Sequence, residues 1–113
     1  MNDDVIARRV LTDGSRMYEV RINRPRCDEQ VGDYVCTWSL TDDSGTAVVS
    51  SDIWGVDGLQ ALIHAIAIMG DRLAVEPYTL SWNGLPGPGL PRHVDPKAQS
   101  GIISIFTDSG NGS

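Results

Sequence analysis

The segment Leu59–Met69 constrains the fold most strongly, because nine of its eleven residues are apolar and only Gln60 and His64 interrupt it. A helix at a protein surface normally carries one apolar stripe, so a helix that is apolar around most of its circumference must be covered on more than one side. We therefore expect a long helix packed between other layers. The chain's own sheet, its C-terminal segment and another protein are the candidates for that cover.

Residues at both ends of this segment predict where the helix begins and ends. Asp57 is a good N-cap, and Gln60 follows three residues later. This spacing predicts a capping box, in which the Asp57 carboxylate accepts from the Gln60 amide and the Gln60 side chain returns to the cap amide. Gly70 could end the helix in a left-handed conformation, but we favour a last turn that reaches Leu73.

Alternating apolar and polar residues predict four strands before the helix and a fifth after it, separated by turn-forming residues such as Asp42–Gly45. Consecutive strands joined by short turns form an antiparallel meander. The fold class is therefore α+β, an antiparallel meander of about five strands with one long apolar helix packed on one face. The predicted strands are Val5–Leu11, Met17–Asn23, Tyr34–Leu40, Thr46–Ile53 and Tyr78–Trp82. We expect buried positions for Cys36, Trp38, Trp54 and Trp82.

The 113 residues are enough for one domain with a core of its own, so we expect a single domain over 1–113. Prolines and glycines make residues 84–101 an expected loop without regular structure. Residues 101–106 have strand propensity and could add a last strand or lie across the helix. Residues 108–113 are expected to be a disordered tail.

The net charge of −6 is unevenly distributed, with −1 up to Thr41 and −5 from Asp42 onward. Nucleic acids and anionic membranes both require concentrated positive charge, so neither is an expected partner. A basic protein is the natural complement of an acidic surface. The candidate binding residues lie in the second predicted hairpin, its following strand and the long loop: Asp42, Asp43, Asp52, Arg92, His93 and Asp95.

No pattern in the sequence predicts a metal or a cofactor. His93 and Asp95 lie two residues apart, but no third and fourth ligand is near them in sequence, so a solvated loop is the better interpretation. Cys36, His64 and Asp57 could in principle form a nucleophile, base and orienting group. Because Cys36 is expected in the core, where a thiol is inert, we predict no catalytic residues.

Cys27 and Cys36 could form a disulfide, but two cysteines do not define a framework. The acidic start of the chain lacks the features of a signal peptide, and no apolar run reaches the roughly 18 residues that a membrane span needs. A cytoplasmic location is therefore expected. In a reducing compartment, free thiols are favoured over a disulfide.

The segments 54–62 (WGVDGLQAL), 7–9 (ARR) and 22–25 (INRP), with Ala65 and Met69-Gly70, comprise 19 of the 113 residues. They resemble a family of small bacterial proteins of unknown function. This resemblance implies a meander followed by a helix, and it assigns no activity and no site residues. The chain also resembles, in class only, the small acidic immunity proteins that neutralise bacterial toxins.

Three functions follow as expectations. The leading one is a non-enzymatic protein-binding module, with toxin neutralisation as one form of it. The first alternative is a homodimer without a ligand, in which the helix or an edge strand packs against the symmetry mate. The second alternative is an enzyme that uses Cys36 or His64.

Overall fold

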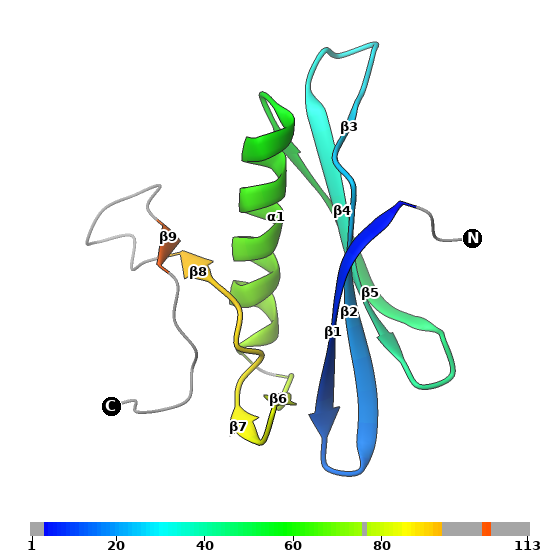
Figure 1. Cartoon of the computed structure of the whole chain (residues 1–113), viewed down its shortest axis with the longest axis vertical. Coiled ribbons are helices and arrows are strands. Elements are labelled where there is room, and N and C mark those ends of the chain that lie inside the picture. Colours follow the sequence, from blue (N-terminus) through cyan, green and yellow to red (C-terminus); the bar gives the residue numbers. More distant parts are fainter. Residues whose placement is uncertain (1–3, 76, 94–102, 105–113) are drawn as a thin grey trace.

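The computed structural model describes residues 4–75, 77–93 and 103–104. They form a large antiparallel sheet, one long helix on one face of it, and a small two-stranded sheet on the far side of the helix (Figure 1). The predicted α+β architecture is confirmed. No helix within these ranges is long and apolar enough to cross a membrane.

Four long strands, β1, β2, β4 and β5, form the predicted meander, in which each pairs with the next along the chain. The short strand β3 pairs with β4 beyond the end of β2, and β6 and β7 extend the sheet beside β1. The strands span β1 Val5–Asp13, β2 Arg16–Asn23, β3 Arg26–Cys27, β4 Tyr34–Asp42, β5 Ala47–Gly55, β6 Ser81–Trp82, β7 Leu85–Pro86, β8 Arg92–His93 and β9 Ile103–Ser104. The large sheet therefore has seven strands in the described residues, of which only four are long.

The helix-facing side of the sheet forms the core, because alternate residues of each strand point to the same face. Trp38, at the centre of β4, is 1% exposed, and its register partners Ile22 and Ser51 lie on the same face. The buried sheet residues of this core are Leu11, Val20, Ile22, Cys36, Trp38 and Leu40. The predicted burial of Cys36 and Trp38 is confirmed.

The helix α1 spans Gly58–Leu73, so it reaches the predicted last residue. The Asp57 side chain accepts from the Gln60 amide at 2.8 Å, as the capping box requires. The returning bond differs from the prediction: the Gln60 side chain accepts from the amide of Val56, at 2.6 Å, and not from that of Asp57. The Gln60 side chain therefore satisfies the backbone N–H of Val56, which lies one residue before the N-cap Asp57.

Small residues let the helix lie close to the sheet. Ala61, Ala65, Met69 and Leu73 are buried at a spacing of four residues and belong to the same core as the strands. A Cβ on Gly55, the last residue of β5, would lie 2.4 Å from the backbone nitrogen of Ala61. The helix start is thereby held against the end of β5.

The opposite side of α1 is covered at its C-terminal half by residues 88–93. Gly70 is buried there, and a Cβ on it would lie 2.0 Å from the carbonyl oxygen of Pro91. The N-terminal half is different, since Leu59 is 65% and Ile63 40% exposed. The expected double cover of the helix therefore applies to its C-terminal half.

Three predictions from the sequence are corrected. The fifth strand, expected over 78–82, is limited to Ser81–Trp82, and the loop expected over 84–101 contains the two-residue strands β7 and β8. Trp54, expected in the core, is 45% exposed because it points to the sheet face away from the helix, whereas its neighbour Ile53 faces the core. The expectations for 94–102 and 105–113 lie outside the described residues, while residues 103 and 104 form β9, which pairs with β8.

Substituting Gly70 by Ala should destabilise the protein. Alanine is favoured over glycine by about 1 kcal/mol inside a helix, but here its methyl group would collide with the Pro91 carbonyl, and overpacking costs about 1–3 kcal/mol. Gly58→Ala is the matched control, because its Cβ would meet only ordinary contacts, the nearest at 3.6 Å. Urea unfolding should show a lower free energy of unfolding for G70A and no decrease for G58A. A G70A variant more stable than the native protein would contradict the packing of Gly70 against Pro91.

Candidate functional site

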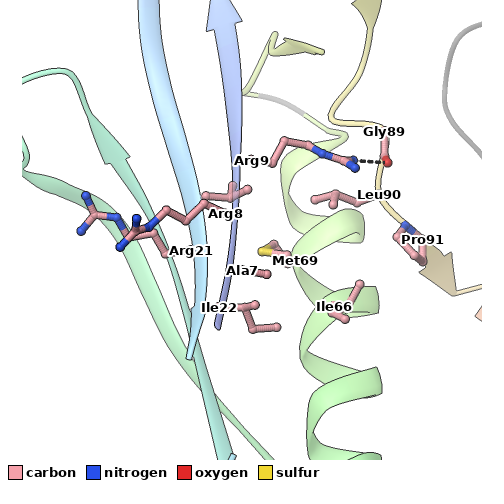
Figure 2. Close-up of a pocket in the computed structure, with 11 residues that line it drawn as sticks. Ala7, Arg8, Arg9, Arg21, Ile22, Ile66, Met69, Gly89, Leu90 and Pro91 are labelled. Carbon is pink, nitrogen blue, oxygen red and sulfur yellow. Dashed lines mark hydrogen bonds between the residues drawn. The ribbon is translucent and has the colours of Figure 1, made fainter. Parts of the chain in front are cut away.

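A cavity of about 370 Å³ lies between the sheet and the helix, on the β1 side of the sheet (Figure 2). Strands β1 and β2 form one wall, the C-terminal half of α1 forms another, and residues 89–91 close it from the side. It is lined by Ala7, Arg8, Arg9, Val20, Arg21, Ile22, Ile66, Met69, Gly89, Leu90 and Pro91.

The interior of this cavity is apolar because it is a continuation of the core face. Ala7 and Ile22 are register partners on β1 and β2, and their short and branched side chains leave space beneath the helix. Met69 projects from α1 toward β1 (Figure 2), and Ile66, about one turn earlier on the helix, also lines the cavity. Such a concave apolar surface with few polar groups is typical of a small-molecule site.

The three arginines that line the cavity differ in direction. The side chains of Arg8 and Arg21, which are register partners, point to the sheet face away from the helix (Figure 2). Arg9 points toward the helix side, to residues 88–89. Arg9 is therefore the one cation that the described lining presents on the cavity side of the sheet.

Arg9 is held by backbone oxygens and by an aromatic ring. Its Nη1 donates to the carbonyl of Gly89 at 2.6 Å and to that of Pro88 at 3.4 Å. Its guanidinium lies 3.8 Å from the centre of the Trp82 ring, a cation–π geometry. No carboxylate among residues 4–75, 77–93 and 103–104 forms an ion pair with it. Partial burial lowers the pKa of the Arg9 guanidinium from its usual value, although it stays charged at neutral pH.

Gly89 makes this arrangement possible. Its φ is +66°, and a Cβ there would lie 2.3 Å from the Trp82 ring. The neighbouring Gly87 donates from its amide to the Leu80 carbonyl at 2.8 Å, which fixes the segment against the sheet. Arg9, Trp82 and Gly89 therefore join β1, β6 and the 87–91 segment at the cavity wall.

The predicted acidic residues lie elsewhere, in the β4–β5 hairpin. Asp42 accepts from the amides of Ser44 and Thr46, both at 3.0 Å, and from the Ser44 hydroxyl at 2.7 Å. These bonds lower the pKa of the Asp42 carboxyl. Asp43 is exposed in the same turn, and Asp52, exposed on β5, accepts from the Thr37 hydroxyl at 2.6 Å.

The predicted loop residues lie on the far side of the helix or outside the described chain. Arg92 and His93 form β8, and the Arg92 Nε lies 3.8 Å from a carboxylate oxygen of Asp71 on α1. Asp95 is outside the described residues. The structure thus separates the candidate binding residues into the β4–β5 hairpin and β8.

The cysteines are free thiols, Cys27 exposed and Cys36 buried. The Cys36 thiol donates to the Asn23 carbonyl at 3.3 Å, and burial raises its pKa to about 11. Asp57 is engaged in capping the helix. Over the described ranges, no group of three or more His, Cys, Asp and Glu residues could hold a metal ion.

Comparison with known proteins gives a family and no function. A domain of unknown function, DUF6968, matches residues 7–92 of the 113-residue chain. The chain belongs to the DUF6968 family. No curated protein and no solved structure matches it. The matched DUF6968 range begins in β1 and ends in β8, so it includes every residue that lines the cavity.

Sequence reasoning missed the cavity, although one signal for it exists. The β1 residues on the helix-facing side of the sheet alternate as Ala7, Arg9 and Leu11, so an arginine interrupts an otherwise apolar set. An arginine in such a position needs a partner that the strand itself does not provide. The partners come from residues 82–89, which sequence reasoning treated mainly as a loop.

Substituting Arg9 by Lys should lower the free energy of unfolding by about 1–2 kcal/mol. Lysine keeps the charge but loses the planar stacking on Trp82 and the fixed direction of the bond to Gly89. Arg8→Lys, on the opposite sheet face, is the control and should change stability by less than about 0.5 kcal/mol. If the two substitutions lowered the free energy of unfolding equally in urea, the contacts of Arg9 with Trp82 and Gly89 would not stabilise the cavity wall.

Proposed function

We propose that this protein is a non-enzymatic binding protein, and that the cavity between β1, β2 and α1 takes a small ligand with an apolar body and one anionic group. The observation that supports this most directly is an apolar cavity of about 370 Å³ with one cation at its wall. Pockets of this size and composition are typical of ligand sites in proteins.

The apolar body of the ligand would contact Ile22, Ile66 and Met69. These side chains come from two different elements, and the described segment 89–91 adds Leu90 and Pro91 on a third side. Removing a methylene group from water into such surroundings is favourable by about 0.8 kcal/mol. Affinity would therefore depend mainly on the length of the apolar chain.

The anionic group would pair with Arg9. In the described part of the chain, hydrogen bonds of this guanidinium come from Nη1 alone, so Nε and Nη2 keep donors for a carboxylate. Its present acceptors are neutral carbonyls, and a cation that is partly removed from water gains from an anion beside it. A carboxylate at this wall would supply the opposite charge.

A catalytic role for Cys36 is disfavoured by its environment. The thiolate is the nucleophilic form of cysteine, and a pKa of about 11 leaves almost none of it at neutral pH. The Asp57 carboxylate, the expected orienting group, is bound to the Gln60 amide. These features support binding over catalysis as the proposed role.

Saturated carboxylates from hexanoate to decanoate test this proposal by calorimetry. Affinity should rise about four-fold for each added methylene until the cavity is filled, and decanol should bind about ten-fold more weakly than decanoate. Ile66→Trp should fill the cavity and abolish binding. Ile63→Trp, on the exposed part of the same helix, should leave binding unchanged. Absence of binding throughout the series, or equal binding by I66W, would overturn the proposal.

A second candidate is the binding of a basic protein in the bacterial cytoplasm, with toxin neutralisation as one form of it. Asp43 and Asp52 are exposed, and the lowered pKa of Asp42 keeps its carboxylate charged at neutral pH and well below it. All three residues belong to one hairpin, with Asp42 and Asp43 at its turn and Asp52 further along β5, opposite Thr37. Complementary charge of this kind accelerates the association of two proteins.

The product of the adjacent gene is the partner to test for this second candidate. If that protein is basic and binds, Asp43→Lys should slow association about ten-fold at low salt, and the difference should shrink as salt screens the charges. Glu29→Lys changes the charge equally at an exposed site outside the hairpin and should have little effect. Surface plasmon resonance measures both rates, and equal effects would exclude the hairpin as the contact.

A further inference from the structure

Strand β5 forms an edge of the large sheet. It pairs with β4 along one side, and in residues 4–75, 77–93 and 103–104 no strand pairs with its other side. The strand is nine residues long, so its outer side presents a row of backbone donors and acceptors. Such an edge is a template for pairing with another chain.

This edge lacks most of the features that prevent pairing. Natural edge strands are usually short, bulged, or interrupted by lysine or proline. β5 contains no lysine or proline and has one charge, Asp52. Its pairing with β4 shifts register near its start, where Val48 has no partner between Ala47 and Val49. Two large side chains on it are exposed, Val48 at 47% and Trp54 at 45%.

The pattern of polar and apolar residues in β5 is symmetric about Ser51. Reading outward from that residue, the polar pair Ser50 and Asp52 comes first, followed by the apolar pairs Val49 and Ile53 and then Val48 and Trp54. In an antiparallel pair formed by two copies of one strand, residues at equal distances from the centre lie directly opposite each other on the same face. We propose that two copies of this protein pair through β5, antiparallel and centred on Ser51, to form one continuous sheet.

This register suits both faces of the joined sheet. On the helix side, Val49 of one copy would lie opposite Ile53 of the other, next to the core. On the outer side, Ser50 would lie opposite Asp52, and Val48 opposite Trp54. Centring the pair on Asp52 would place two carboxylates face to face, and centring it on Ser50 would oppose Val48 and Asp52. Of these three registers, the one centred on Ser51 pairs apolar with apolar and polar with polar residues.

The helix next to this edge adds apolar surface. Gly55, which ends β5, lies against Ala61 near the start of α1. Between these two residues in the chain, the side chains of Val56 and Leu59 are 73% and 65% exposed. Exposed apolar groups that continue from an unpaired strand are typical of an interface. This surface lies at the sheet edge opposite the one beside the cavity, so the proposed dimer is independent of the proposed ligand.

Charge substitutions at Ser50 test both the dimer and its register. The full chain at micromolar concentrations should sediment as a particle of twice its 12.2 kDa mass and dissociate on dilution. In the proposed register, Ser50 of each copy lies opposite Asp52 of the other copy, so the dimer contains this pair twice. Ser50→Lys should therefore tighten the dimer about five-fold and Ser50→Asp should weaken it about five-fold. The double variant S50D/D52K should restore it.

The control is Ser39→Asp, which adds the same charge to the same sheet face one strand further in, opposite Ser50. It should change the dissociation constant much less than Ser50→Asp, and circular dichroism should show all variants folded. A monomer at every concentration would overturn the proposal. A dimer that responds equally to all the substitutions would also overturn it, because it would then use another surface.

Cysteine cross-linking gives a second readout. In a Cys27→Ser background, which removes the exposed native thiol, Ser51→Cys should form a disulfide between the copies under mild oxidation. Opposed Cα atoms in antiparallel strands lie about 4.5–5.5 Å apart, within the range that a disulfide spans. Ser15→Cys, exposed in the β1–β2 turn, should not cross-link. Equal cross-linking of the two would show random collision and contradict the register.

Discussion

The close packing of α1 against the sheet, and of its C-terminal half against residues 88–93 as well, is the constraint on which the rest of the structure depends. Alanines at positions 61 and 65 bring the helix close to the sheet, and Gly70 brings residues 90–91 close to the helix. A helix this apolar cannot leave both faces in water. Residues 88–93 are therefore part of the folded domain, and the family match, which ends at residue 92, includes nearly all of that segment.

The two proposed interactions use opposite edges of one sheet. The cavity lies where β1 borders residues 80–91, and the self-complementary strand β5 lies beyond β4 at the other edge. Joining two copies through β5 would leave both cavities accessible, one at each end of the extended sheet. A ligand and a partner copy could thus be bound together without competing for the same residues.

The sequence predicted the meander and the helix well because both depend on local patterns. Alternating apolar and polar residues predicted β1, β2, β4 and β5, and the N-cap Asp57 predicted the first turn of the helix. The placement of Trp54 was wrong because period-two alternation gives the two faces of a strand, and tertiary packing decides which of them is covered. The cavity was missed for a related reason. Its wall joins Arg9 to Trp82 and Gly89, and no local pattern carries a contact between residues so far apart.

That long-range contact has a consequence for how the protein is made. Arg9 and Gly89 are 80 positions apart, so the bond between them cannot form until nearly the whole domain has been synthesised. The hairpins and the helix involve neighbours in the chain and can form earlier, whereas distant contacts form late. During translation the cavity would be the last part of the domain to take shape, and a nascent chain would complete its wall only once residues 89–91 had left the ribosome.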